Sequence, residues 1–316
     1  MKVLVTGADG FVGSLLVRRL AELGHETVAA VRPSDAMPRE LARRDALGDV
    51  PMIELEVLDS DSVRRAVDRN WDVIVHMAAV SSGSQAQRDP MSAWHVNAVG
   101  TARIAYGLGA AKAAGGDPLL LFVSTAEVYG AGSEASRVET DVAQPVSPYA
   151  ASKLAAEVAC LETSRRTGLR VVIARPFPHI GPGQDERFVV PAFLERIRFA
   201  KKIDAPVVKV GRIAPVREFT HVVDVVSAYA LLIDKGRAGE VYNVSCGRAT
   251  SVRDIFFMIS DALGHRVIPE EDHELIRPVD IPYLVGDSSK LRVETGWKPT
   301  ISLEETIREI VDAEAN

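Results

Sequence analysis

Tyr149 and Lys153 are the pair of residues whose types and spacing best suit acid–base chemistry. They are four positions apart, which places both side chains on one face of a helix. A tyrosine normally keeps its proton up to a pH of about 10, so it exchanges protons poorly at neutrality. A neighbouring ammonium group favours the phenolate and lowers the tyrosine pKa. The pair therefore predicts a site at which Tyr149 exchanges a proton with a bound molecule.

This spacing is common by itself, so the surrounding sequence decides its meaning. A buried apolar run, Leu119–Ser124, is predicted to be a strand and is followed by Thr125 and Glu127. Open parallel sheets bind ligands at the carboxyl ends of their strands. We therefore expect Thr125 to lie beside Tyr149 and to hydrogen-bond the carbonyl or hydroxyl group that reacts.

A glycine-rich stretch near the amino terminus indicates a dinucleotide. Gly7, Gly10 and Gly13 are spaced G-x-x-G-x-x-G, one residue wider than the common dinucleotide fingerprint. Such a loop joins a strand to a helix whose free N–H groups can bind a pyrophosphate. The residues expected to bind this cofactor are Gly7, Asp9, Gly10, Phe11, Val12 and Gly13.

The ends of the next two predicted strands bear on the choice of cofactor. A carboxylate after the second strand usually accepts the 2′-hydroxyl of NAD, but this chain has Arg32 there. A guanidinium can pair with a 2′-phosphate, so Arg32 favours NADP(H), while NAD(H) stays possible if Arg32 only faces water. After the third strand, Glu56 and Val57 can contact the adenine, although a surface acid is an equally good interpretation of Glu56.

Elements that must position these residues follow from the hydrophobic pattern. Apolar strands separated by helices indicate an α/β fold, a Rossmann-type doubly wound parallel sheet with helices on both faces. The predicted strands are Lys2–Thr6, Glu26–Val31, Met52–Val57, Asp72–Ala78, Leu119–Ser124 and Leu169–Ala174. The predicted helices are Phe11–Gly24, Ser60–Asn70, Pro90–Gly115 and Ser147–Gly168.

The pattern changes after about Arg175, where prolines and glycines interrupt the alternation. Further helices are predicted over Val189–Lys202, Val222–Lys235, Val252–Leu263 and Leu303–Ala313. We predict an NAD(P)-binding Rossmann domain over residues 1–175 and a smaller α+β substrate-binding lobe over residues 176–316, with some exchange of strands or helices. A cleft between two such units is a natural substrate site.

Composition narrows the class of protein. The chain has 316 residues, of which 47% are hydrophobic and 25% charged, as in ordinary globular proteins. Lys and Arg number 37 against 43 Asp and Glu, a net charge of −6 without a basic block, which argues against a nucleic-acid partner. Cys160 and Cys246 fit neither a disulfide framework nor a metal site, so we expect no metal and a reducing cytoplasm. No apolar run approaches the roughly 18 residues of a membrane span, so no membrane partner is expected.

Together these motifs resemble the extended short-chain dehydrogenase/reductases, in the branch of nucleotide-sugar epimerases, dehydratases and reductases. The resemblance covers essentially the whole chain and implies an NAD(P)-dependent oxidoreductase that acts on a nucleotide sugar. The motifs that carry it are Gly7-x-x-Gly10-x-x-Gly13, His76–Ala79, Asn97, Ser124-Thr125, Tyr149-x-x-x-Lys153, Arg175–Gln184, Arg217–Asp224, Arg277–Asp280, Gly286–Leu291 and Thr295–Pro299.

Within the branch, Arg175–Gln184 is most similar to the GDP-4-keto-6-deoxy-D-mannose reductase group. The resemblance implies reduction of the C4 carbonyl of a nucleotide-linked 4-keto-6-deoxyhexose. Tyr149 would donate the proton, Lys153 would bind the nicotinamide ribose, and Thr125 would hold the carbonyl. The group usually has Asn where this chain has Pro178, which offers no amide to a diphosphate.

The resemblance also assigns the remaining residues to the two ligands. The cofactor would further contact Ala78, Ala79 and Asn97. The nucleotide sugar would contact Ser81, Ser82, Thr125, Glu127, Pro178, His179, Val190, Arg217 and Arg277. The two arginines match family positions that contact the nucleotide or diphosphate, where a guanidinium can bind in bidentate geometry.

Three further hypotheses stay open. Thr125-x-Glu127 also resembles the GDP-mannose 4,6-dehydratases, in which the glutamate is a catalytic base, so a 4,6-dehydratase or a 4-epimerase is the alternative enzyme. A non-catalytic NADP-binding sensor is the alternative of another class, against which the complete set of Thr125, Tyr149 and Lys153 argues. Family members commonly pair through their two long helices, which implies a homodimer through Pro90–Gly115 and Ser147–Gly168.

Overall fold

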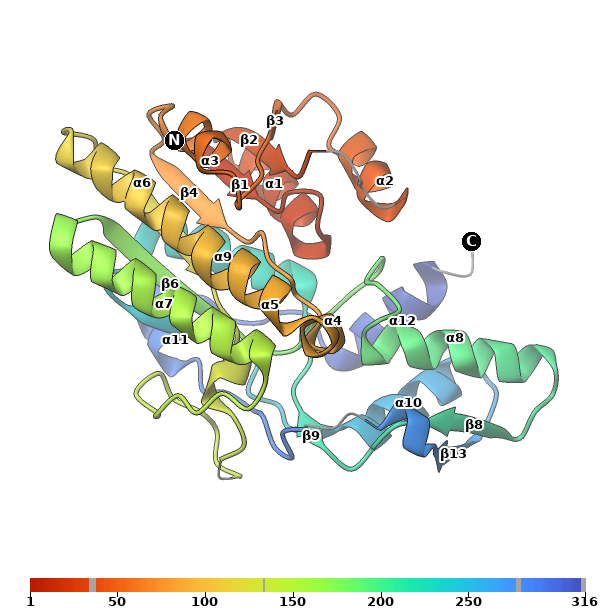
Figure 1. Ribbon diagram of the computed structural model, residues 1–316. Helices are drawn as coiled ribbons and strands as arrows, with labels where there is room; N and C mark the ends of the chain where they lie inside the picture. Colours follow the sequence, from red (N-terminus) through yellow and green to blue (C-terminus); the bar gives the residue numbers. More distant parts are fainter. Residues whose placement is uncertain (34–37, 133, 277–279, 314–316) are drawn as a thin grey trace.

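A seven-stranded parallel sheet forms the main layer of the computed structural model, which describes residues 1–33, 38–132, 134–276 and 280–313 (Figure 1). The strands are β1 (Lys2–Thr6), β2 (Glu26–Val31), β3 (Met52–Glu54), β4 (Val73–His76), β5 (Leu119–Val123), β6 (Arg170–Pro176) and β11 (Val241–Val244). Their order, β11-β6-β5-β4-β1-β2-β3, reverses between β1 and β4. Ligands bind at such a reversal in doubly wound sheets. The predicted α/β fold class is confirmed.

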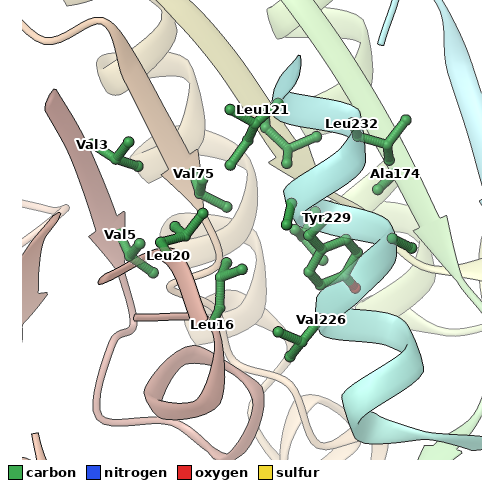
Figure 2. Packing of buried hydrophobic residues seen from close by; sticks show 14 of the residues in the cluster. Val3, Val5, Leu16, Leu20, Val75, Leu121, Ala174, Val226, Tyr229 and Leu232 are labelled. Atoms are coloured by element: carbon green, nitrogen blue, oxygen red, sulfur yellow. The ribbon is translucent and has the colours of Figure 1, made fainter. Parts of the chain in front are cut away.

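Helices cover both faces of this sheet because successive strand residues point to opposite sides. Val3 and Val5 pack with α1 (Phe11–Glu22), α9 (Val222–Lys235) and α11 (Ser289–Thr295). Figure 2 shows this face, where Leu16 and Leu20 of α1 and Val226, Tyr229 and Leu232 of α9 lie over the strands. The opposite face, which includes Leu4, packs against α3 (Ser60–Val67), α6 (Thr101–Ala113) and α7 (Pro148–Thr167). The sheet is therefore buried on both sides.

The long helix predicted over Pro90–Gly115 is divided in the structure. It consists of α5 (Pro90–Ala93), a π-helical segment η1 (Trp94–Gly100) and α6. Thr101 Oγ1 donates a hydrogen bond to the Asn97 carbonyl at 2.5 Å, a local bond that competes with the regular helical ladder. Such π segments are rare and are frequent at functional sites.

Three predicted strands are shorter in the structure. The strand expected over Met52–Val57 is β3, which ends at Glu54, where its partner is Val31, the last residue of β2. Since β2 ends there, Glu56 and Val57 lie in the loop before α3. The strand expected over Asp72–Ala78 is β4, which spans Val73–His76, and β5 ends at Val123 rather than Ser124.

A second core lies beside the sheet, at the right of Figure 1. It is formed by α8 (Val189–Lys202), α10 (Val252–Ala262) and α12 (Leu303–Ala313), with the parallel pair β8 (Val207–Val210) and β13 (Ile268–Glu271). The remaining short pairs are β7 (His179–Ile180) with β10 (Thr220–His221) and β9 (Val216–Arg217) with β12 (Thr250–Ser251). The helices predicted in this half are confirmed, with α10 ending one residue early.

The second half of the chain also contributes to the main sheet. β11 is its edge strand beside β6, and α9 covers one of its faces. The division into residues 1–175 and 176–316 stays a prediction. Within the ranges described above, no helix is both long and apolar enough to cross a membrane.

Candidate active site

The glycine loop lies between β1 and α1, beside the reversal of strand order. Gly7 has a φ of +67°, which side chains other than glycine rarely adopt. A Cβ at Gly13 would lie 2.1 Å from the Gly7 carbonyl oxygen, and one at Gly10 would lie 3.0 Å from it. α1 then starts without a side-chain cap on its first N–H groups. A loop that side chains would fill, next to an uncapped helix start, fits a pyrophosphate.

The end of β4 is tied to this loop through Thr6. Its Oγ1 accepts hydrogen bonds from the N–H groups of Met77 and Ala78, both at 3.1 Å, and contacts His76 Nδ1 at 2.7 Å. A Cβ at Gly7 would come within 2.9 Å of the Ala78 nitrogen, so Ala78 borders the glycine loop, while its contact with the cofactor stays a prediction. Burial, reinforced by the Lys153 charge, lowers the pKa of His76 to about 3. His76 is therefore a neutral structural residue.

Of the other residues predicted in this loop, Asp9 and Phe11 connect it to other elements. Phe11 lies near the second lobe, because a Cβ at Gly181 would be 3.5 Å from its ring. Val12 instead packs against the core of the sheet. Asp9 forms an ion pair with Arg44 at 2.8 Å.

That ion pair belongs to a group of arginines at the end of β2. Arg44 and Arg43 lie on α2 (Pro38–Ala46), a helix absent from the sequence prediction. Arg44 also donates to the carbonyl of Arg32 at 2.8 Å, and Arg43 donates to the carbonyl of Gly183 at 2.8 Å. The structure thus brings the unpredicted guanidinium group of Arg44 to the backbone of Arg32, where a dinucleotide ribose is expected, and that of Arg43 to the backbone of Asp9 and Gly183.

Three predicted cofactor residues have partners within the protein. The Glu56 carboxylate accepts from the Leu58 N–H at 2.9 Å, and the Val57 side chain is buried against Gly100. Asn97 is fully buried in η1, and it donates to Ser152 Oγ at 3.0 Å and exchanges hydrogen bonds with the Val80 backbone. Asn97 therefore ties the loop after β4 to α7, while the adenine contacts of Glu56 and Val57 stay predictions. Ala79 is partly buried in that same loop.

Tyr149 and Thr125 meet at the carboxyl end of β5. Ser147 caps α7 by accepting from the Ala150 N–H at 3.1 Å, which sets Tyr149 in the first turn. The Thr125 side chain lies close enough to the Tyr149 phenol to lower its pKa. Burial raises the pKa of Tyr149 well above its ordinary value, the Glu127 carboxylate raises it further, and Thr125 only partly opposes them. The structure thus brings the predicted acid, its hydroxyl partner and the acidic Glu127 together.

Lys153 lies one turn further along α7 and faces the sheet. Its Nζ donates to the Val123 carbonyl at 2.6 Å and lies 4.7 Å from the centre of the Phe122 ring. The sequence predicts that this ammonium lowers the Tyr149 pKa. The pKa is instead raised, because burial and the Glu127 carboxylate outweigh the lowering by Thr125. Burial also lowers the pKa of Lys153 to about 8, against the effect of the Glu157 carboxylate.

A polar network beneath Lys153 was missed by sequence reasoning. Glu157 is buried and paired with Arg175 at 2.7 Å, and Ser124 donates to the same carboxylate. The available signal was the spacing, since Glu157 follows Lys153 by four residues, as Lys153 follows Tyr149.

Predicted substrate residues are spread over both halves. Ser82 caps α4 (Gly83–Arg88) by accepting from the Gln85 N–H at 3.4 Å, and Ser81 beside it is exposed. His179 and Pro178 are partly exposed, and burial lowers the pKa of the His179 ring. Their nucleotide-sugar contacts stay predictions.

The other three predicted substrate residues have different surroundings. Arg217 pairs with Asp280 at 2.7 Å. Val190 is fully buried in the second core, which leaves its side chain inaccessible to a ligand. Arg277 lies outside the described residues. No group of three His, Cys, Asp or Glu side chains in the described chain could hold a metal ion.

Comparisons with known proteins agree with this arrangement. A family model described as GDP-mannose 4,6 dehydratase matches residues 4–310. The GDP-6-deoxy-D-mannose reductase of Pseudomonas aeruginosa is 34% identical over 313 residues, 98% of this chain and 96% of that protein. The structure of RMD from Pseudomonas aeruginosa complexed with NADPH has a TM-score of 0.80 at 32% identity and covers 99% of this chain and 98% of that one. UDP-glucose 4-epimerase from Thermotoga maritima with UDP-glucose has a TM-score of 0.87 at 28% identity, over 100% and 99% of the two chains.

The resemblance inferred from the motifs is thereby confirmed along the whole chain. The matched family and the relatives span reductases, dehydratases and epimerases, which share an NAD(P) cofactor and nucleotide-sugar chemistry. This chain belongs to the extended short-chain dehydrogenase/reductase family, in its branch of NAD(P)-dependent enzymes that modify nucleotide sugars.

Proposed function

We propose that this enzyme reduces the C4 keto group of a nucleotide-linked 4-keto-6-deoxyhexose, with NADPH as the reductant. The observation that carries the proposal is the buried, protonated phenol of Tyr149 beside Thr125 at the end of β5. A reduction needs a proton donor at the developing alkoxide, and a phenol with a raised pKa is in that protonation state at neutral pH. The similarity to the Pseudomonas GDP-6-deoxy-D-mannose reductase supports the class of substrate.

Each residue of the set has a distinct task in this reaction. The glycine loop would hold NADPH, which would supply the hydride. Thr125 donates a hydrogen bond to the keto oxygen, and Tyr149 transfers its proton to the same oxygen as negative charge develops there. Lys153, whose Nζ is anchored on the Val123 carbonyl, binds the nicotinamide ribose.

The choice of NADPH over NADH is supported by the arginines near β2. Arg32 follows the strand, and α2 places Arg43 and Arg44 within reach of the same backbone and of the glycine loop. Guanidinium groups suit a 2′-phosphate, whereas a carboxylate suits the 2′-hydroxyl of NAD. The Asp9 carboxylate, which contacts this group, already pairs with Arg44. The similarity to a structure complexed with NADPH agrees with this choice.

The nucleotide diphosphate is assigned to Arg217. Its guanidinium is held by Asp280 at 2.7 Å and is partly exposed. A pre-oriented arginine loses less conformational freedom when it binds a phosphate.

A homodimer through α6 and α7 is also part of the proposal. These two helices lie side by side, and together with η1 they expose large apolar residues: Trp94, Val99, Tyr106 and Val158. Association through this face would remove them from water. Val158→Glu should yield a monomer in sedimentation velocity, whereas Val293→Glu on α11, also highly exposed, should not.

A 4,6-dehydratase or 4-epimerase is the second candidate, and Glu127 favours it. Its carboxylate is close enough to raise the Tyr149 pKa, so it faces the same reacting centre. A base at that position could remove a proton from the sugar.

The test is to incubate the protein with GDP-4-keto-6-deoxymannose and NADPH and to follow the nicotinamide absorbance. Turnover is expected, and Tyr149→Phe should abolish it while leaving NADPH binding intact. Tyr106→Phe, at an exposed position on α6, is the matched control. Conversion of GDP-mannose or a UDP-hexose without net NADPH oxidation would favour the second candidate, and retained turnover in Tyr149→Phe would exclude its role as proton donor.

A further inference from the structure

A buried network that the proposed mechanism does not use lies under Lys153. Glu157 is one helical turn beyond it on α7, with a side chain that is 3% exposed. The Glu157 carboxylate accepts from Nε and Nη2 of Arg175 at 3.0 and 2.7 Å, and from Ser124 Oγ at 2.5 Å. A buried charge is costly unless it is paired and hydrogen-bonded, and this one is both.

This carboxylate joins α7 to two strands at the point where the site begins. Ser124 follows the last residue of β5 and stands between Val123, whose carbonyl holds Lys153, and Thr125, whose side chain lies beside Tyr149. Arg175 lies near the end of β6, the next strand of the sheet. A shift of Glu157 would therefore move the strand end that presents both contacts.

The same carboxylate acts on the charge of Lys153. Burial lowers the pKa of that ammonium to about 8, and Glu157 and the Cys160 thiol oppose the shift. The other groups that face Lys153 are the phenol of Tyr149, which is protonated, and His76 of β4, which is neutral. Glu157 is therefore the anion in these surroundings that sustains the ammonium.

We propose that Glu157 is a positioning residue for the reaction: it keeps Lys153 in its ammonium form at neutral pH and fixes the strand end that carries Thr125. Arg175 in turn keeps the Glu157 carboxylate buried and oriented. The functional part of this inference rests on the proposed role of Lys153 in holding the nicotinamide ribose. The effect of Glu157 on Lys153 does not depend on that role and can be measured without turnover.

Two variants of the same ion pair separate this role from a merely structural one. Glu157→Gln removes the anion, and Arg175→Gln removes its partner but leaves the anion. Lysine labelled with ¹³C at Cε is titrated by NMR, with the Lys153 signal assigned through its loss in Lys153→Arg. Glu157→Gln should lower the Lys153 pKa by about 1–3 units. Arg175→Gln should leave it unchanged or raise it, because the carboxylate is then less neutralised.

Equal shifts in the two variants, or no shift in Glu157→Gln, would overturn the proposal. If Glu157→Gln fails to fold because Arg175 is left unpaired, the double variant Glu157→Gln/Arg175→Gln buries no net charge. It should show the same fall in the Lys153 pKa, and a wild-type value there would equally overturn the proposal.

NADPH affinity measured against pH connects the effect to the site. Glu157→Gln should bind NADPH as the wild type does at a pH below the Lys153 pKa measured for the variant, where Lys153 is charged in both proteins. It should lose affinity at neutral pH, where only the wild type keeps the charge. If Glu157→Gln lowers the Lys153 pKa as expected but leaves the NADPH affinity unchanged, the result would support the role of Glu157 and count against the ribose contact in the proposed function. The two failures are thus distinguishable.

Discussion

The Thr125 side chain lies beside the Tyr149 phenol at the carboxyl end of β5, and burial keeps the phenol protonated. The sequence predicts the pair but not the protonation state. A phenolate at rest would suit removal of a proton, whereas a phenol suits donation. With both hydroxyl groups at one strand end, a carbonyl oxygen placed between them could receive a hydrogen bond from each.

Glu127→Gln tests which reaction this pair serves. Its carboxylate contributes to the raised Tyr149 pKa but is not needed to donate a proton to an alkoxide. For a reductase, kcat with the keto sugar should fall by less than about tenfold, whereas loss of a catalytic base costs about 10²–10⁴. The measurement is steady-state kcat, with Glu54→Gln on the exposed part of β3 as control. A loss in the larger range would point to the dehydratase or epimerase.

Gly13→Ala should damage the cofactor loop specifically. The added Cβ would lie 2.1 Å from the Gly7 carbonyl oxygen, so the loop must move. We expect the free energy of unfolding to fall by about 1–3 kcal/mol and the stabilisation by NADPH to be lost. Denaturant unfolding with and without NADPH measures both. The control is Gly83→Ala at the start of α4, where a Cβ meets nothing within 4 Å; equal effects of the two changes would argue against a tight cradle.

Arg44→Gln should weaken recognition of the 2′-phosphate. Arg44 lies between Asp9 and the Arg32 carbonyl, and a charge-assisted bond to phosphate is expected to be lost. Affinity for 2′,5′-ADP, measured by calorimetry, should fall about tenfold while that for 5′-AMP is unchanged. Arg64→Gln, on an exposed surface pair, serves as control. An equal loss for both nucleotides would mean that Arg44 only supports the loop through Asp9.

His76 should make the protein less stable in acid. Its pKa is about 3 in the folded state against 6.5 for an unperturbed histidine, so between these values the unfolded chain binds a proton that the folded one refuses. The contribution of neutral His76 to the free energy of unfolding is therefore fully present above about pH 6.5 and is lost as the pH falls towards 3. His76→Gln should flatten this dependence in urea unfolding at several pH values. His273→Gln, at an exposed site, should not, and an unchanged slope in His76→Gln would contradict the assignment.

Local patterns predicted most of the elements and the central pair. β1, α1 and the face shared by Tyr149 and Lys153 follow from periodicity over a few residues, and the structure reproduces them. The features that the sequence does not predict depend on contacts between residues that are distant in the chain. β3 ends early because β2 offers no further partner at Val31. The Tyr149 pKa depends on burial, which is a property of the packed site rather than of the helix.

The arginines of α2 and the network of Glu157 were missed for a related reason. Arg44 reaches Asp9 across a stretch of chain with no apolar periodicity to mark a helix, and its partner is known only once the loop is folded. The helical spacing places Glu157 on the same face as Lys153. Its partner Arg175 lies on a strand, so the spacing alone does not predict the ion pair or its burial.

The position of β11 at the edge of the sheet bears on how the chain is synthesised. β6 is complete at Pro176, but its neighbour is not made until Val241–Val244 leaves the ribosome. Until then the N–H and C=O groups along the outer edge of β6 have no strand to pair with, and such open edges are templates for aggregation. A growing chain of this protein therefore exposes an unpaired strand edge between those two points.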